Sequence, residues 1–279
     1  MRWLKSNIEK ISNLKAEGSP ESLTYAALEC RLAIERICYD RLRIAHDYIS
    51  QDDIRKWQPK DVVNTLIQEV DSKIAASYTF SIGKEPIKKE GDLTREDYET
   101  MEFVPVGSQV GFDPKKMGKL WNAISSFLHV KVPKVKSDRV TEYGDPAALV
   151  KKIDEVLAEL EHLSQGTLIG SGFGETVSFT CDCGLKIMRR VAFLGEGQIV
   201  NCLSPECLES YTCIFNEEDI DFIRNTMRFN CYSCEAEITF PKNKAVKLQK
   251  ETAEPIPCGR CGETNYIMWQ LKQVVKNSE

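Results

Sequence analysis

The chain has 279 residues, of which 42% are hydrophobic and 28% are charged, and its formal net charge is −5. This composition is that of a globular protein and excludes a disordered or collagen-like chain. The acidic balance argues against a protein that coats nucleic acid through its overall field, so any such binding has to be local. No apolar stretch is long enough to span a membrane, and residues 1–10 lack the apolar core of a signal peptide, so we expect a cytoplasmic protein with no membrane partner.

Five helices are predicted over the first 165 residues, because apolar side chains recur there at helical spacing. Three of them begin where a capping residue precedes a proline suited to the first helical turn, at Ser19-Pro20, Asp113-Pro114 and Asp145-Pro146. The expected ranges are 1–15, 20–49, 59–74, 113–129 and 145–165. Residues 83–111 lose the periodicity and mix glycine, proline and charges of both signs, which indicates a long connection.

The character of the sequence changes at a glycine-containing stretch near residue 170. Nine of the 11 cysteines then fall between Cys181 and Cys261, and alternating segments such as 177–180 indicate short strands. We therefore predict an α+β protein of two domains, with an all-α helical bundle at residues 1–169 and a domain of small β modules at residues 170–279. The second domain contains two similar halves, which we expect at about 175–225 and 226–274.

The second half of the cysteine-rich domain has the spacing of a zinc site. Cys231-x2-Cys234 is followed 23 residues later by Cys258-x2-Cys261. Zinc binds four thiolates at the corners of a tetrahedron, and a two-residue spacer lets one tight turn present two sulfur atoms to the same ion. Residues 227–273 resemble the zinc-ribbon family in this spacing and in the strands that flank it.

The first half is less regular, with one residue between Cys181 and Cys183 and four residues between Cys202 and Cys207. We expect these four cysteines to bind a second zinc ion, with Cys213 as the alternative to Cys207. Disulfides are the competing interpretation, but thiols at such spacing in a reducing compartment more often bind metal. Four thiolates leave no open position for water and this domain contains no histidine, so both zinc ions are expected to be structural.

Two lysine-rich stretches are candidates for nucleic-acid binding. The first joins the two cysteine pairs of the second half and contains four lysines with no acidic residue between them: Lys242, Lys244, Lys247 and Lys250. Beside two aromatic residues, Phe240 and Tyr266, this loop can grip a phosphate backbone and stack a base. The competing interpretation is a lysine-rich turn in water.

The second lysine-rich stretch, residues 113–139, has a net charge of +5. Helical spacing places Lys115 and Lys119 on one stripe with His129, and Lys131 and Lys134 follow shortly after it. We expect this stripe to bind nucleic acid, and a polar helix face in water is the alternative.

The helical part resembles the HEPN superfamily of bacterial helical bundles in residues 27–36 and 120–129. The resemblance implies an up-and-down bundle of four or five helices, frequent dimerisation, RNA as the usual substrate, and membership of toxin and phage-defence systems. Active members carry an arginine, four to six residues and then a histidine. Before His129 the three positions that should hold this arginine are occupied by other residues, Asn122, Ala123 and Ile124, so the motif is broken there.

Arg41 and His46 match the arginine-to-histidine spacing on an earlier helix and are the candidate catalytic pair. An imidazole can move the proton of a ribose 2′-hydroxyl, and an arginine can stabilise the charge of the phosphorane. The competing interpretation is a structural Arg41 paired with Asp40 or Asp47 and a partly exposed His46.

Together these features predict a zinc-binding protein that recognises nucleic acid, with RNA preferred, in a prokaryotic defence or toxin-like system. One alternative is a metal-independent endoribonuclease, although the sequence leans against an enzyme. Another is a scaffold subunit whose acidic zinc ribbons bind a partner protein. A homodimer is a further expectation. The sequence leaves the type of nucleic acid, the oligomeric state and the partner undecided.

Overall fold

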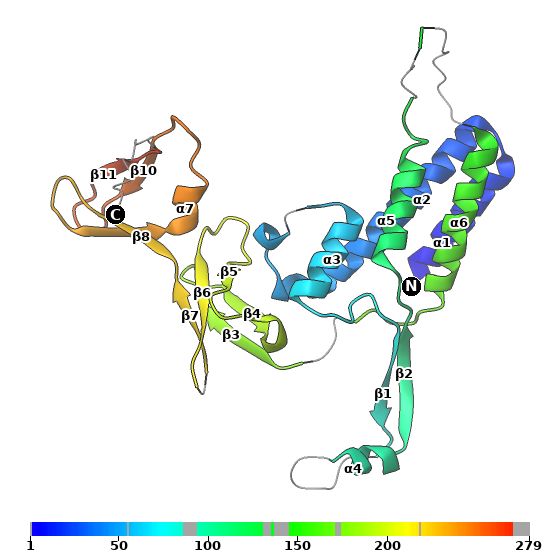
Figure 1. Ribbon diagram of the computed structural model, residues 1–279, viewed down its shortest axis with the longest axis horizontal. Coiled ribbons are helices and arrows are strands. Elements are labelled where there is room, and N and C mark those ends of the chain that lie inside the picture. The colour runs from blue at the N-terminus through cyan, green and yellow to red at the C-terminus, as the bar shows by residue number, and fades with distance from the viewer. Residues whose placement is uncertain are drawn as a thin grey trace, which may run out of the picture. The chain divides into compact units, whose positions relative to one another are not determined.

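The computed structural model (Figure 1) describes residues 2–54, 56–85, 94–130, 135–136, 145–170, 174–217 and 219–269. In this part of the chain the fold is mixed α+β, with helices in the N-terminal part and small antiparallel sheets in the C-terminal part. The chain divides into two compact units, one made of residues 1–46 and 56–173 and the other of residues 47–55 and 174–279. No helix among the described residues combines the length and the apolar character needed to cross a membrane.

The five predicted helices are confirmed, and a sixth short one is present in the helical unit. They are α1 (Arg2–Glu17), α2 (Pro20–Ala45), α3 (Pro59–Glu69), α4 (Arg95–Thr100), α5 (Pro114–Ser125) and α6 (Pro146–Ser164). The predicted caps are formed: Ser19 accepts a hydrogen bond from the Ser22 backbone N–H at 3.1 Å, and Asp113 accepts one from the Lys115 N–H at 2.8 Å. Such caps satisfy backbone donors that a helix start leaves free, and each contributes about 1 kcal/mol.

Helix α2 is the centre of the helical unit, because it packs against α1, α3, α5 and α6 (Figure 1). Its inner face buries Cys30, Ile34 and Cys38 completely. Both of these cysteines are therefore core residues, as their place on the apolar stripe predicts. Burying an aliphatic side chain such as Ile34 contributes about 1.5–3 kcal/mol to stability.

The helical unit also contains a β-hairpin, so the prediction of an all-α bundle is wrong in this respect. Strand β1 (Tyr78–Gly83) pairs antiparallel with β2 (Phe103–Gln109), and the hairpin extends away from the helices with α4 near its tip (Figure 1). The strands lie in and beside the stretch interpreted as a connection. Strand β1 does alternate, with Tyr78, Phe80 and Ile82 separated by small polar residues, and this signal was missed. Strand β2 does not alternate and contains Pro105, so only the backbone ladder between the two strands defines it.

Helix α2 ends at Ala45, four residues before the expected end. Two short 3₁₀ helices follow, η1 (His46–Tyr48) and η2 (Gln51–Asp53), and Ser50 caps the second one. Residues 47–55 belong to the second compact unit. There Asp53 accepts a hydrogen bond from the side chain of Asn201 at 2.8 Å and lies 3.4 Å from the guanidinium of Arg189.

The second unit contains two small β modules, and the predicted strand at 177–180 is confirmed. The first module holds β3 (Thr176–Thr180), β4 (Lys186–Arg190), η3 (Val191–Phe193), β5 (Ile199–Asn201), β6 (Ser210–Phe215) and β7 (Ile220–Arg224). The second holds β8 (Thr226–Asn230), β9 (Glu237–Pro241), α7 (Lys242–Val246), β10 (Glu254–Pro257) and β11 (Thr264–Ile267). The strands form four antiparallel sheets, β3–β4 and β5–β6–β7 in the first module and β8–β9 and β10–β11 in the second.

Each β module has only a small apolar core. In the first, Ile187, Val200 and Tyr211 are buried, and Phe179 stacks on Phe222 with ring centroids 4.2 Å apart. In the second, the buried apolar side chains are Ile238, Phe240, Ala245 and Ile256. Cores of this size rarely hold a fold without a metal or disulfides, so the cysteines that line them are the expected source of stability.

Candidate metal centres

Two groups of four cysteines among the described residues bring their sulfur atoms close together. In each group the four Sγ atoms lie within 4.8 Å of one another. The first group is Cys181, Cys183, Cys202 and Cys207, and the second is Cys231, Cys234, Cys258 and Cys261. None of these residues forms a disulfide.

The distances between the sulfur atoms match those of a tetrahedral metal site. Four thiolates at about 2.3 Å from one ion have sulfur atoms about 3.8 Å apart. The observed Sγ–Sγ distances are 3.8 Å for Cys181–Cys207, 3.7 Å for Cys183–Cys202, and 3.7 Å for both Cys231–Cys261 and Cys234–Cys258. A disulfide would need about 2.05 Å. Both groups can therefore hold one metal ion each.

The second centre is built from two equivalent turns. Cys231 and Cys234 lie in the turn between β8 and β9, and Cys258 and Cys261 lie in the turn between β10 and β11. In each turn the first cysteine closes the loop through its backbone N–H, at 2.9 Å from the carbonyl of Ala236 and at 2.8 Å from that of Glu263. The residue after the second cysteine has a positive φ in both turns, 57° at Glu235 and 77° at Gly262.

Backbone hydrogen bonds favour the thiolate form of the first cysteine in each turn. The N–H groups of Cys234 and Ser233 lower the pKa of Cys231 to about 6. Those of Cys261 and Arg260 lower the pKa of Cys258 in the same way. Thiolates are the metal-binding form of cysteine, so these turns prepare two of the four ligands before an ion arrives.

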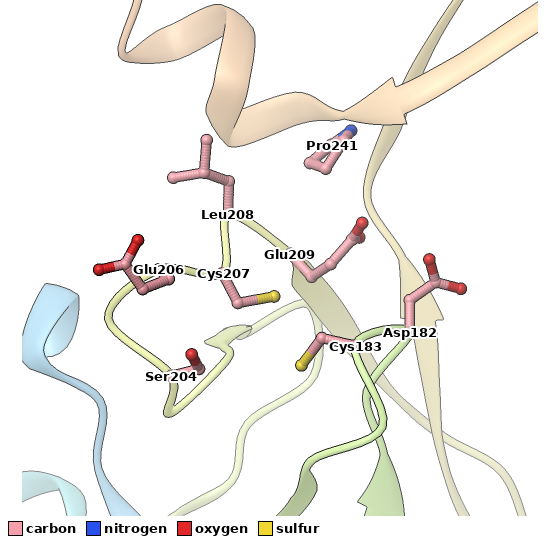
Figure 2. A pocket seen from close by; sticks show the side chains of 8 residues that line it. All are labelled: Asp182, Cys183, Ser204, Glu206, Cys207, Leu208, Glu209 and Pro241. Carbon is pink, nitrogen blue, oxygen red and sulfur yellow. The ribbon is translucent and has the colours of Figure 1, made fainter.

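The first centre reaches the same sulfur geometry with different spacers. Cys181 and Cys183 lie in the turn between β3 and β4, where Gly184 at φ 88° donates its N–H to the carbonyl of Cys181 at 2.8 Å. Cys202 directly follows β5, and Cys207 precedes β6. Figure 2 shows the sulfur atoms of Cys183 and Cys207 directed into a common space.

The choice between Cys207 and Cys213 is decided by this geometry. Cys207 lies in the four-sulfur group, whereas Cys213 is completely buried on β6 and is not part of the group. Burial raises the pKa of the Cys213 thiol, which keeps it neutral. Cys213 is therefore a core residue of the first module.

Sequence reasoning missed one polar residue beside each centre. Tyr211 accepts a hydrogen bond from the Asp182 backbone N–H at 2.9 Å, and its hydroxyl lies 3.4 Å from the sulfur of Cys181. Asn265 accepts one from the Tyr232 N–H at 3.1 Å, and its amide nitrogen lies 3.6 Å from the sulfur of Cys231. Both side chains are buried, and each stands four residues after the last cysteine of its group.

The two side chains therefore play the same part in the two modules, although one is a phenol and the other an amide. Each side chain accepts a hydrogen bond from the backbone N–H of the residue that follows the first cysteine, and each also contacts the sulfur of that cysteine. A hydrogen bond to a ligand fixes its orientation and tunes its charge. The signal in the sequence was a polar residue at an inward strand position, four residues after the final cysteine of each half.

An arginine connects the two turns of the first centre. Arg224 on β7 forms a two-pronged pair with the buried carboxylate of Glu209, at 2.7 Å from Nε and 2.5 Å from one terminal nitrogen. The same arginine lies 3.1 Å from Asp182, which stands between the first two cysteines. Because Glu209 follows Cys207 by two residues, Arg224 ties both cysteine-bearing loops together.

A shallow hollow of about 410 Å³ borders the first centre (Figure 2). It is lined by Asp182, Cys183, Ser204, Glu206, Cys207, Leu208, Glu209 and Pro241. Three of these residues are acidic, and Glu206 is exposed. The charge of Arg224 offsets part of the charge of the two other carboxylates, so the hollow keeps an acidic character.

Two of the four lysines between Lys242 and Lys250 form ion pairs, one of them with a residue of the same module. Lys242 and Lys244 lie on α7 and Lys247 follows it; Lys244 pairs with Glu254 at 3.1 Å and Lys247 with Asp52 at 2.8 Å. Phe240 is only 6% exposed, so it cannot stack a base. Tyr266, at 69% exposed, can do so.

The lysine stripe of the helical unit is partly described. Lys115 and Lys119 are exposed on α5, and His129 is exposed four residues after that helix ends. Between them Lys116 pairs with Glu159 on α6. Lys131 and Lys134 lie outside the described residues.

Arg41 and His46 are not brought together by a contact in the described structure. Arg41 is only 2% exposed, and its guanidinium donates a hydrogen bond to the Gln109 side chain at 2.5 Å. Burial lowers the pKa of this guanidinium to about 10. His46 is exposed at the end of α2. Five residues on a helix turn through about 500°, so the two side chains leave α2 in different directions.

Comparison of the chain with models of protein families, with curated proteins and with solved structures found no match.

Proposed function

We propose that this protein binds two zinc ions and that both are structural. The observation that supports this most directly is the pair of four-sulfur groups with Sγ–Sγ distances of 3.7–3.8 Å. Zinc is the metal for which four cysteines in tetrahedral arrangement are the usual structural site. Four thiolates fill the coordination sphere, so no position is left for a reacting water.

Metal content tests this proposal directly. Protein purified without added metal should contain close to two equivalents of zinc by elemental analysis. Cys234→Ser should reduce this to about one equivalent, because a site with three thiolates binds far more weakly. Cys213→Ser is the matched control, since it removes a buried cysteine outside both groups and should leave two equivalents. Metal-free protein with a normal fold would contradict the proposal.

We infer that the zinc-stabilised modules and the helical unit act by binding rather than by catalysis, and that the ligand of the helical unit is nucleic acid. The support is the exposed group of Lys115, Lys119 and His129 at α5. Such a group attracts the phosphates of a nucleic acid, and the counterions that the nucleic acid holds are released when it binds. The resemblance to HEPN bundles, with RNA as the usual substrate and defence or toxin systems as the usual setting, favours RNA.

Titration of labelled single-stranded RNA and duplex DNA at two salt concentrations tests the nucleic-acid proposal. The double variant Lys115→Glu/Lys119→Glu should weaken binding at least about tenfold and reduce its salt dependence. Lys5→Glu/Lys73→Glu, which reverses two exposed lysines elsewhere in the helical unit, is the matched control. Equal binding by all three proteins would mean that the α5 lysines are a solvated face.

A protein partner for the zinc-binding modules is the second candidate, and the acidic hollow beside the first centre favours it. Residues 170–279 contain 15 acidic and 12 basic residues, and each four-thiolate zinc site adds a formal charge of −2. This surface repels phosphates and suits a basic segment of a partner protein. Glu206→Lys, which leaves the cysteines and Arg224 unchanged, should abolish capture of such a partner while leaving the binding of RNA unchanged.

A further inference from the structure

The β1–β2 hairpin of the helical unit is a two-stranded sheet with an exposed apolar end. Ile82 and Val104 pair across the strands, so their side chains lie on the same face. They are 53% and 47% exposed. The hairpin extends away from the helices (Figure 1), and within the described residues no helix makes extensive contact with either strand. A two-stranded hairpin is only marginally stable in water, and a third strand that extends its apolar face stabilises it.

The register of the hairpin shows which backbone groups point outward. The N–H of Lys84 donates to the carbonyl of Glu102 at 2.9 Å, so the even-numbered residues of β1 are the ones that bond to β2. The backbone groups of Thr79, Ser81 and Gly83 therefore point to the outer edge of β1. Among the described residues, none of these three N–H groups has a hydrogen-bond partner.

The outer edge of β2, in contrast, is closed. The N–H of Ser108 donates to the hydroxyl of Thr167 at 2.9 Å, and its carbonyl accepts the N–H of Thr167 at 2.8 Å. Pro105 has no N–H to offer, and Val106 has no partner in the register, which marks a bulge. Proline and bulges both prevent an edge strand from pairing with another chain. Strand β1 contains neither, so the outer edge of β1 is the one that can accept a further strand.

We propose that the outer edge of β1 binds an extended segment of a partner protein, which adds a third strand to the hairpin. The outward backbone groups supply the hydrogen bonds, and alternate side chains of the added strand lie beside Ile82 and extend the apolar face. The charge of the hairpin end selects the partner, because residues 84–102 contain seven acidic and four basic residues. The bound segment is therefore apolar at alternate positions and carries a basic residue next to this end. This site involves neither the α5 lysines nor the metal centres.

Titration of the full zinc-loaded chain with a labelled peptide tests this edge. The peptide alternates valine and threonine over about six residues, the usual length of a strand, and ends in a lysine. Ser81→Pro removes one outward N–H from β1 and should weaken binding at least about tenfold. Phe103→Pro is the matched control, because it removes an N–H at the first residue of β2 and should leave binding unchanged. Helical content and zinc content confirm that the rest of each variant is folded.

Two N-methylated versions of the peptide test the backbone pairing on the wild type, without any change to the chain. Methyl groups on alternate nitrogens block only one edge of the peptide, so one version should lose binding and the other should retain it. Replacing the lysine of the peptide by glutamate should weaken binding severalfold, since it meets the acidic end of the hairpin.

Five results would each overturn the proposal. The first three are a wild type that does not bind the peptide at about 1 mM, binding that survives Ser81→Pro, and the same result for both methylated peptides. The fourth is equal binding of the lysine and glutamate peptides. The fifth is an oligomer of the wild type that Ser81→Pro dissociates, because the edge of β1 would then pair with a second copy of this chain.

Discussion

The two β modules arrange four sulfur atoms in the same way but support them differently. The second module uses two equivalent turns with two residues between the cysteines, and backbone N–H groups stabilise the thiolates. The first uses spacers of one and four residues. It adds strand β7, from which Arg224 ties the two cysteine-bearing loops together. Both centres combine backbone and side-chain support, since the N–H of Leu185 also lowers the pKa of Cys183 and Asn265 lies against Cys231 in the second module. What the first centre has in addition is the Arg224 connection between its two loops.

The largest expected effect is the loss of one module without the other. Cys258→Ser should remove one equivalent of metal and unfold the second module, because metal binding supplies several kcal/mol of its folding free energy. Circular dichroism should show nearly unchanged helical content, and limited proteolysis should cut residues 226–269 selectively. Cys202→Ser should do the same in the first module. Loss of helical content in either variant would contradict separate cores.

Arg224→Ala should destabilise the first module alone, by about 2–3 kcal/mol, since it leaves the buried Glu209 carboxylate without a partner. The expected readout is faster release of one metal equivalent to a chelator. Adding Glu209→Gln should recover part of this loss, because the buried group is then neutral. Equally fast release of both metal equivalents would contradict the prediction that Arg224 supports the first centre alone.

Removal of the hydrogen bonds to the first cysteine of each centre should weaken one metal at a time. Tyr211→Phe and Asn265→Ala should each lower the affinity of the neighbouring centre by about tenfold to a hundredfold. Competition with a chromophoric chelator measures this for both metals. Tyr232→Phe is the control, because it keeps the backbone N–H that donates a hydrogen bond to Asn265. It should leave the metal affinities of both centres unchanged. Unequal results in the two modules would show that the phenol and the amide are not equivalent.

The smallest expected effect concerns the left-handed residue after the second cysteine of each turn in the second module. Glu235→Gly should stabilise this module by about 0.5–1 kcal/mol, because glycine adopts a positive φ without the penalty that a side chain brings. Gly262→Ala should destabilise it by about 1 kcal/mol for the same reason. Chemical denaturation of the zinc-loaded chain measures both. Destabilisation by Glu235→Gly would mean that the glutamate side chain contributes more than its strain costs.

The cysteines of both centres could be predicted because a metal site depends on residue type and spacing, which are written in the chain. The same spacing could not exclude Cys213, since Cys207 and Cys213 both lie within reach of Cys202 along the sequence. Only the path of β5 and β6 places one sulfur in the group and the other in the core. Tyr211 and Asn265 were missed because their shared spacing, four residues after the last cysteine of each group, becomes a signal only when the two modules are compared and the contacts with the sulfur atoms are known.

In the helical unit, too, some features follow from the sequence and others depend on the tertiary structure. The sequence determined the five long helices, because helical periodicity and caps are local properties. Arg41 could equally have faced solvent, and its contact with Gln109, 68 residues away, was decided by the tertiary structure. The β1–β2 hairpin was decided in the same way, since β1 alternates apolar and polar residues but its partner β2 does not, and the backbone ladder joins two segments that are distant in the sequence. Local patterns thus predict the helices and seven of the eight candidate metal ligands, whereas long-range pairing decides the hairpin, the burial of Arg41 and the fourth cysteine of the first group.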